Sequence, residues 1–441
     1  MKYLEDELNS YTNSDVLAMH MPGHKRNPDY CLKGFNNDIT EIHGFDNLHN
    51  PTGIIKDIET SVEGIWGANS SIISVNGATA PILSSVMAAS NLGKVLVAAN
   101  CHISVWHALE LSDCEFDVIN PSVTNLPFCL EISPEVLSEK LSEDPAIKSV
   151  VITSPTYEGV VSDIESISEV CSRHKVILIV DEAHGSHFGL NEYFPSSAKA
   201  DVVIKSIHKT LHAPTQTAVL LTYSDKLSVK SIRHYMDIVE TSSPSYILMS
   251  GISKVVNDIN NKPDITDSWV KALKDCREAL SSKLEHMKLF NLNNIDPSKL
   301  VILTEGVIDG DFLASKLRDN KIEIEASFPT HIIAMTGIGD TKESLKKFSD
   351  VLLDIDRTLT GTVTLSGKNM VPGDTLKMSM SIKEAARAES ICISRSEAEG
   401  KVSSKYAYRY PPGIPILLPG QLITRQRLDC LPDGLIEVVK G

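Results

Sequence analysis

Short apolar runs bounded by turn-forming residues recur through the first half of the chain and predict buried strands. A run that is continuously apolar, rather than alternating, is typical of a parallel strand covered on both faces. Helical patterns lie between the runs, as after Gly53, where Ile54, Ile58, Val62 and Ile65 recur at helical spacing. The runs occupy residues 72–75, 94–99, 148–154, 176–180, 202–204 and 218–221. We therefore expect an α/β fold with a parallel sheet in its larger domain.

The second half of the chain follows a different pattern. A helix-like stretch extends to about Leu289, and residues 342–359 predict an amphipathic helix. Strands are predicted for the apolar or alternating pieces at residues 300–306, 321–328 and 330–337. The tail combines one helix at 371–390 with a Pro- and Gly-rich segment that is too apolar for a free linker. This half therefore predicts a smaller α+β domain.

The boundary between the two domains is expected near the Asn- and Pro-containing stretch at 260–268. We predict a large domain at 1–265 and a small domain at 266–441. The large domain begins with a segment, 1–52, that is rich in Gly, Pro, His and Asn and has no clear period, so it should be mostly irregular. Ordered loops of this length usually serve function or cover another subunit.

Composition places the chain among ordinary globular proteins. Of its 441 residues, 42% are hydrophobic and 22% charged, and no run approaches the roughly 18 apolar residues of a membrane span. An acidic N-terminus without an apolar core favours the cytoplasm over secretion. The eight cysteines form no CxxC pair, which indicates reduced thiols and no metal site. A net charge of −15 argues against nucleic-acid binding; it mildly favours cationic small molecules, or serves only solubility.

Lys209 stands out as a candidate nucleophile. It lies in the segment 206–220, between the apolar runs at 202–204 and 218–221. Burial between two strands disfavours the ammonium form, so the amine would be suited to form a Schiff base with an aldehyde cofactor such as pyridoxal phosphate (PLP). The alternative is a surface lysine in a loop.

Asp181 ends the apolar run at 176–180, where an ionised carboxylate needs a partner. A protonated pyridine nitrogen would be such a partner, and the pair would keep the ring cationic so that it accepts electrons. The alternative is a solvated aspartate in a turn. Lys209 follows Asp181 by 28 residues, which leaves room for one crossover and one strand and favours the cofactor interpretation.

Two further segments suit a cofactor, although neither is specific alone. The strand at 72–75 leads through Gly77, Ala78 and Thr79 into a helix, and free N–H groups at a helix N-terminus suit a phosphate. Many such turns carry a Gly for geometry alone. His102 follows the run at 94–99 and has an aromatic face that could lie on a flat ring; a hydrogen-bonded core or loop histidine is the other interpretation.

These segments resemble the ornithine/lysine/arginine decarboxylases, PLP enzymes with the aspartate-aminotransferase-type fold. The likeness covers nearly the whole chain, and nine motifs in order make it specific. They are HMPGHK, TEIHGFDNLHNPTG, NGAT, NCHISVWHAL, TSPTYEGVVSDI, DEAHGSHF, SIHKTL, TSSPSY and YPPGIPILLPG. The resemblance implies fold type I with a mostly parallel seven-stranded sheet, and it makes residues 366–435 the C-terminal segment of the family.

The resemblance also implies roles for individual residues. Lys209 corresponds to the Schiff-base lysine, Asp181 to the partner of the pyridine nitrogen, His102 to the stacked ring and Ala183 to the residue beneath the cofactor. His184 resembles a residue near the cofactor phenol oxygen and the substrate carboxylate. The phosphate cup corresponds to Gly77, Ala78, Thr79, Ser206 and His208. In such enzymes the site lies at a dimer interface, so the TEIHGFD and TSSPSY loops are expected to reach a neighbouring subunit.

The sequence departs from the family at three points. It begins almost directly with the HMPGHK segment and so resembles the short form without an N-terminal wing domain. Ile103 follows the stacking histidine where a basic residue is common, and Gln421 stands where Glu is typical. The Gln421 departure leaves the substrate open among arginine, lysine and ornithine.

The resemblance predicts a PLP-dependent α-decarboxylase of a basic amino acid that forms a diamine or polyamine precursor, with Lys209 or His184 returning a proton to Cα. Two alternatives remain. One is an aminotransferase or another amino-acid-transforming enzyme of the same fold. The other is a catalytically silent regulatory homologue, against which the retained Lys209 and Asp181 argue.

Overall fold

The structure is a computed structural model of the 441-residue chain. It describes residues 3–14, 16, 18–22, 24, 25, 27, 29, 31, 33–365, 376–409, 413–432 and 434–440. Parts of two motifs, Gly23 in HMPGHK and residues 410–412 in YPPGIPILLPG, lie outside the described residues, as does the first part of the tail predicted at 371–390.

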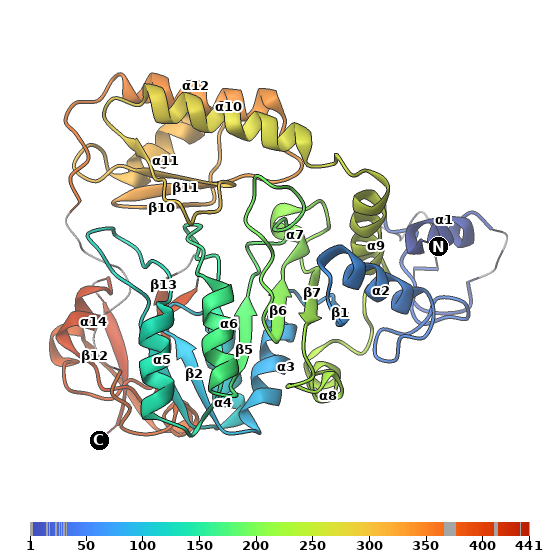
Figure 1. Ribbon diagram of the computed structural model, residues 1–441, viewed down its shortest axis with the longest axis horizontal. Helices are drawn as coiled ribbons and strands as arrows, with labels where there is room; N and C mark the ends of the chain where they lie inside the picture. Colours follow the sequence, from blue (N-terminus) through green and yellow to red (C-terminus); the bar gives the residue numbers. More distant parts are fainter. Residues whose placement is uncertain are drawn as a thin grey trace. The chain divides into compact units, whose positions relative to one another are not determined.

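The largest sheet has seven, mostly parallel strands, as the resemblance predicts (Figure 1). Its order is β1-β7-β6-β5-β4-β2-β3. The apolar runs predict six of the strands and miss the strand at Phe116–Ile119. The strands are β1 (Ser70–Ser74), β2 (Lys94–Ala98), β3 (Phe116–Ile119), β4 (Ile147–Thr153), β5 (Ile177–Asp181), β6 (Val202–Lys205) and β7 (Ala218–Thr222). Strand β7 is antiparallel to both of its neighbours, β1 and β6.

The chain divides into two compact units. The first unit comprises Met1–Ser85, Val180–Ala272 and Thr336–Lys342, and the second unit comprises Val86–Ile179, Leu273–Met335 and Glu343–Gly441. This division differs from the predicted boundary at 265/266, which stays a prediction.

The first unit contains β1, β6, β7 and the end of β5, together with several helices. The helices are α1 (Leu4–Thr12), α2 (Ile54–Trp66), α7 (Ile207–Thr210), α8 (Val229–Val239) and α9 (Tyr246–Asn261), with the start of α3 (Thr79–Ser90) and of α10 (Asp267–Lys283). Helix α9 packs against both α1 and α2 (Figure 1). The predicted helix after Gly53 is therefore confirmed as α2, which buries Ile55, Ile58 and Val62.

The second unit contains the remaining sheets and helices. Its helices include α4 (Ile103–Ser112), α5 (Pro134–Glu143), α6 (Ile164–Arg173), α11 (Gly310–Asp319), α12 (Lys342–Asp356), α13 (Ile382–Arg387) and α14 (Arg425–Asp429), with a 3-10 turn at Arg395–Glu397. A four-stranded sheet has the order β10-β11-β9-β8, with β8 (Lys288–Leu289), β9 (Lys299–Leu303), β10 (Ala326–Phe328) and β11 (His331–Met335). Helix α11 packs on β10 and β11 (Figure 1).

The tail of the chain folds as two antiparallel strand pairs. They join β12 (Ser390–Ser394) with β15 (Leu435–Val439), and β13 (Ala407–Arg409) with β14 (Ile414–Leu417). Leu417, Leu428 and Val438 are buried in a small apolar cluster of their own. The Pro- and Gly-rich segment is thus part of a packed structure, as its apolar composition predicts.

Three expectations are corrected by the structure. Helix α1 was not predicted; it buries Leu4 and Leu8 and donates a backbone hydrogen bond from Leu4 to Ser253 Oγ at 3.2 Å. The piece at 321–328 is a strand only from Ala326, because its pairing with β11 covers three residues. Helix α10 ends at Lys283, before the expected Leu289, which lies in β8.

Within the described part of the chain, no helix is both long and apolar enough to cross a bilayer. Nor do the described residues contain a cluster of His, Cys, Asp and Glu side chains that could hold a metal ion.

Candidate active site

The ends of β5 and β6 place the main candidate residues in the first unit. Asp181 is the last residue of β5, and Ser206 directly follows β6 as the N-cap of the short helix α7, which contains His208 and Lys209. The backbone N–H of Glu182 donates to Ile204 O at 2.9 Å, so the pairing with β6 continues one residue beyond the end of β5. Side chains that leave neighbouring strand ends converge at one edge of a sheet, where ligands of open α/β folds bind.

Lys209 and His184 form a direct contact. Lys209 Nζ lies 2.8 Å from His184 Nε2, within hydrogen-bond distance. His184 is buried, whereas Lys209 is partly accessible. One proton can pass between an amine and an imidazole held in this way, so the pair is suited to acid–base chemistry.

Asp181 is a buried carboxylate, with only 4% of its surface exposed. Its Oδ1 accepts a hydrogen bond from the N–H of Ala183 at 3.1 Å, and Ala183 is itself buried. Among the described residues, no Lys, Arg or His forms an ion pair with Asp181. A carboxylate removed from water in this way calls for a cationic partner.

The turn before α3 supplies the candidate phosphate site. Gly77 has φ of +66°, a conformation that glycine adopts without strain, and its N–H donates to Gln216 O at 2.7 Å. Ala78 is buried and precedes α3, and Thr79 is exposed as its first residue. The first N–H groups of such a helix have no acceptor within it and are available to an anion.

The loop before β7 joins this turn to the start of α7. Thr217 O accepts hydrogen bonds from the N–H of Ile207 at 3.0 Å and from His208 Nδ1 at 2.9 Å, and it follows Gln216, which binds Gly77. Burial lowers the pKa of His208, and the charge of Lys209 adds to this effect. The structure thus brings the Gly77 turn, Ser206 and His208 together through one loop, which the sequence did not identify.

His102 belongs to the second unit, so its predicted stacking on a ring held at Lys209 stays a prediction. It is the N-cap of α4, and its Nδ1 accepts a hydrogen bond from the N–H of Ser104 at 3.2 Å. A Cβ on Gly413 would lie 3.3 Å from the ring, so the tail packs directly on this histidine, and Ile103 N–H donates to Gly413 O at 2.9 Å.

Gln421, the departure from the family's Glu, is buried in the tail of the second unit. Its Oε1 accepts from Leu418 N–H at 3.0 Å and from Arg427 Nη1 at 3.4 Å. In the described structure the departure therefore affects a buried contact with an arginine of the tail.

A buried ion pair that the sequence did not reveal connects the two strand ends. Lys205 Nζ donates to Glu182 Oε2 and, at 2.9 Å, to Gly185 O. Burial raises the pKa of Glu182 and lowers that of Lys205, and the charge of each opposes the shift in the other. A lysine at the end of an otherwise apolar strand was the available signal, but its partner could not be identified from sequence.

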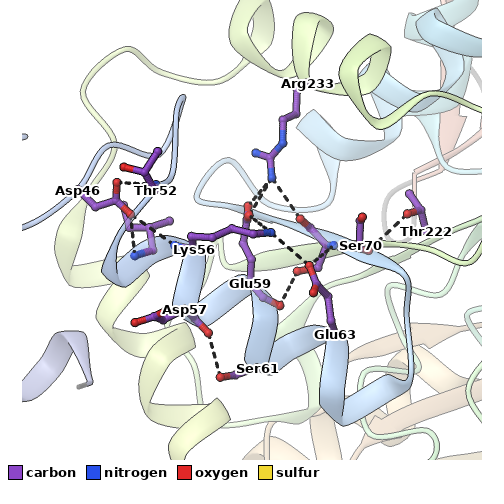
Figure 2. A network of polar contacts seen from close by, with 12 residues as sticks. Asp46, Thr52, Lys56, Asp57, Glu59, Ser61, Glu63, Ser70, Thr222 and Arg233 are labelled. Carbon is purple, nitrogen blue, oxygen red and sulfur yellow. Dashed lines mark hydrogen bonds and ion pairs between the residues drawn. The ribbon is translucent and has the colours of Figure 1, made fainter. Parts of the chain in front are cut away.

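The loops expected to serve a neighbouring subunit contact each other within this chain. Tyr246 Oη donates to Asp46 O at 2.7 Å, and His49 Nε2 lies 2.9 Å from Thr241 O. The carboxylate of Asp46 caps the start of α2 by accepting N–H groups of residues 52, 53, 55 and 56 at 2.8–3.4 Å (Figure 2). Asp46 therefore has a structural task.

The residues of the first unit fit PLP. An amine that can form a Schiff base, a buried carboxylate that calls for a cation and a helix N-terminus for a phosphate match the aldehyde, the ring nitrogen and the phosphate. The match rests on the chemistry of these donors and on the unpaired buried charge of Asp181.

Comparisons with known proteins agree with this chemistry. The arginine decarboxylase of Halalkalibacterium halodurans is 27% identical over 95% of this chain and 90% of its own. The Francisella novicida lysine decarboxylase LdcF superposes with a TM-score of 0.82 at 18% identity, over 99% of this chain and 81% of its own. An SPT solved with PLP gives a TM-score of 0.53 at 13% identity, over 69% and 76% of the two chains. These structures show that the chain has fold type I, as predicted.

Two sequence models of one family match the chain and together cover most of it. "Orn/Lys/Arg decarboxylase, major domain" matches residues 4–306, and "Orn/Lys/Arg decarboxylase, C-terminal domain" matches residues 368–431. The chain belongs to the Orn/Lys/Arg decarboxylase family.

Proposed function

We propose that this protein is a PLP-dependent carboxy-lyase that removes the α-carboxylate of a basic amino acid and releases CO2 and a diamine or polyamine precursor. The observation that carries the proposal is the Lys209–His184 contact at 2.8 Å, in a chain of this decarboxylase family whose buried Asp181 forms no ion pair with a Lys, Arg or His among the described residues. The relatives whose names state a substrate act on arginine or lysine.

Each candidate residue has a distinct task in this proposal. PLP bound at the site supplies the electron sink for the pair left at Cα when CO2 departs. Lys209 holds the cofactor, and Asp181 keeps a proton on the ring nitrogen by its negative charge. Ala183 would pack beneath the ring, and His102 keeps the stacking role that the family resemblance implies, so that the two residues would exclude water from the cofactor. The phosphate is held by Gly77, Ala78, Thr79, Ser206 and His208.

A proton must return to Cα after CO2 departs. Because Lys209 Nζ and His184 Nε2 lie 2.8 Å apart, one of them can deliver this proton while the other replenishes it. The buried position of His184 protects the transfer from bulk water.

The test is an incubation of the purified protein, supplied with PLP, with arginine, lysine and ornithine in turn. Released CO2 is measured, and the product is identified by mass as the corresponding primary amine. Lys209→Ala serves as the inactive control. A keto acid without CO2 would support the aminotransferase alternative, and no product from any of the three would support a silent homologue.

We further propose that the enzyme acts in the cytoplasm as a homodimer with shared active sites. The polar loops at 40–53 and 241–246 are held against each other and are suited to reach a neighbour together. Mixing inactive Lys209→Ala chains with chains inactivated by a change at Ser243, an exposed loop residue, should regenerate activity. Asp46, the other position that the motifs indicate, is unsuitable for this test because its loss would uncap α2. Continued inactivity in verified heterodimers would mean that each chain builds its site alone.

A further inference from the structure

The ion pair between Glu182 and Lys205 is buried and contacts Trp66, Gly185, Ser197 and Ala198 of the first unit. Both side chains are almost fully buried, at 3% and 0% exposure. Glu182 Oε1 also accepts the N–H of Ala198 at 2.8 Å, and Oε2 accepts Ser197 Oγ at 3.2 Å. Lys205 Nζ lies 5.3 Å from the centre of the Trp66 ring, over which its charge is favourably placed.

The position of the pair in the chain is informative. Glu182 directly follows Asp181, and Lys205 directly precedes Ser206 in the segment that contains Lys209. Successive side chains of an extended chain point to opposite faces, so a contact on one face constrains the neighbouring residue on the other. The pair therefore acts on both candidate catalytic segments at once.

Two further contacts bind the same segments together. Lys205 Nζ donates to Gly185 O at 2.9 Å, and Ser186 Oγ donates to Ser206 O at 2.6 Å. A Cβ on Gly185 would come within 2.8 Å of Glu182 Cγ, so this turn has no space for another side chain. His184 lies between these anchored residues, and its contact with Lys209 joins the same two segments.

Burying an ion pair in this space costs free energy, because both charges are removed from water. Apolar residues of similar volume often stabilise a protein at least as well as a buried ion pair, because they avoid the desolvation of two charges. Apolar packing, however, does not fix the direction of a side chain as hydrogen bonds to Gly185 O, Ala198 N and Ser197 Oγ do. The pair is better explained by the geometry that it imposes than by stability.

We propose that Glu182 and Lys205 are positioning residues, which hold the turn after β5 against the end of β6 so that Lys209 and Asp181 keep the geometry needed for reaction with PLP. The proposal rests on the proposed function of Lys209 as the residue that binds the cofactor. A displacement of about 1 Å in a reacting group can reduce its rate by about 100-fold.

The test uses three variants of the full-length protein. Lys205→Met removes the charge and keeps most of the apolar stem. Glu182→Gln keeps the shape and one acceptor for Ala198 N–H. Lys199→Met, in the same segment as Ala198 but exposed, is the matched control.

Each variant is stripped of cofactor, treated with pyridoxal 5'-phosphate, and reduced with borohydride. The rate at which Lys209 becomes covalently labelled by the cofactor is measured by peptide mass spectrometry, well below the unfolding temperature. The dissociation constant for pyridoxal phosphate is measured as well. We expect labelling to slow 10- to 100-fold in Lys205→Met and in Glu182→Gln, with the control unchanged. A merely structural role would lower the unfolding temperature and leave the labelling rate of the folded protein unchanged.

The outcomes separate this proposal from the proposed function. Wild-type labelling at a residue other than Lys209 would overturn the function of Lys209 itself. Labelling of Lys209 at the wild-type rate in both folded variants would overturn the positioning role alone. If Lys205→Met is recovered only unfolded, the isosteric Glu182→Gln decides, because it retains the side-chain volume.

Discussion

Replacing Arg233 with Met should destabilise the first unit by an amount that depends strongly on pH. Arg233 Nη2 donates to both carboxylate oxygens of Glu59 at 2.8 and 2.9 Å, and Glu59 is completely buried in α2 (Figure 2). Removing one member of a buried pair costs about 3–5 kcal/mol. Lys56 remains 3.3 Å from Glu59, and Arg233 is 26% exposed, so we expect about 2–4 kcal/mol near pH 8.

The pH dependence follows from the carboxyl group. Burial raises the pKa of Glu59 above its ordinary 4.5, and Arg233 and Lys56 oppose that rise. Without Arg233 the folded-state pKa rises further. The unfolded chain loses this proton at its ordinary pKa while the folded chain retains it, so stability falls as pH rises between the two pKa values. Below the unfolded pKa both states are protonated, and the deficit of the variant should be small.

The assay is urea unfolding followed by circular dichroism and by fluorescence at about pH 4 and about pH 8, with two probes because two compact units need not unfold together. Arg233→Met combined with Glu59→Gln should show a deficit almost independent of pH. Arg318→Met, which removes an exposed pair with Glu323 at 3.3 Å, should cost less than about 1 kcal/mol. An equal deficit of Arg233→Met at both pH values would refute the reasoning, because the buried charge would then not be its source.

Three other substitutions test the remaining assignments. Lys209→Ala should abolish turnover and the visible absorbance of bound cofactor while circular dichroism shows that the protein still folds; full activity would contradict the role of Lys209. Asp181→Asn should retain cofactor but lower kcat by orders of magnitude, more than His102→Ala, which should mainly weaken cofactor affinity; the reverse order of kcat would reverse the two roles. Burial raises the pKa of Glu158 to about 7, so this group makes stability decline as pH rises from its unfolded pKa of 4.5 to about 7; Glu158→Gln should flatten that decline in urea titrations.

Most strands of the seven-stranded sheet could be predicted because a strand that is buried on both faces appears in the sequence as an uninterrupted apolar run. The run at 202–204 became β6 (Val202–Lys205), and the run at 176–180 became β5 (Ile177–Asp181), each within one residue. Helix α1 was not predicted because only two of its residues, Leu4 and Leu8, are buried. Its N-terminus is bound to Ser253 of α9, which is far away in the sequence. Tertiary contacts of this kind have no local pattern.

In the candidate site, too, residues within a local sequence pattern could be predicted, and residues that depend on contacts distant in the sequence could not. Lys209 and Asp181 could be recognised because each follows a buried strand and belongs to a motif. Glu182 directly follows Asp181, and Lys205 lies four positions before Lys209. From the sequence around each of them, a solvated charge at the end of a strand would be expected. Glu182 and Lys205 are 23 positions apart in the sequence, and only the fold shows that they form a buried ion pair.

Helix α2 connects the loop at 46–53 with the segment that carries Lys209. Its start is capped by Asp46, its middle is bound through Glu59 to Arg233, and its last residue, Trp66, covers Lys205. A substitution in the loop can therefore disturb the Lys209 segment of its own chain through this helix. Loss of activity after such a substitution is consequently no evidence that the loop serves a neighbouring subunit. Only recovery of activity in mixed dimers distinguishes a shared site from an effect transmitted along α2.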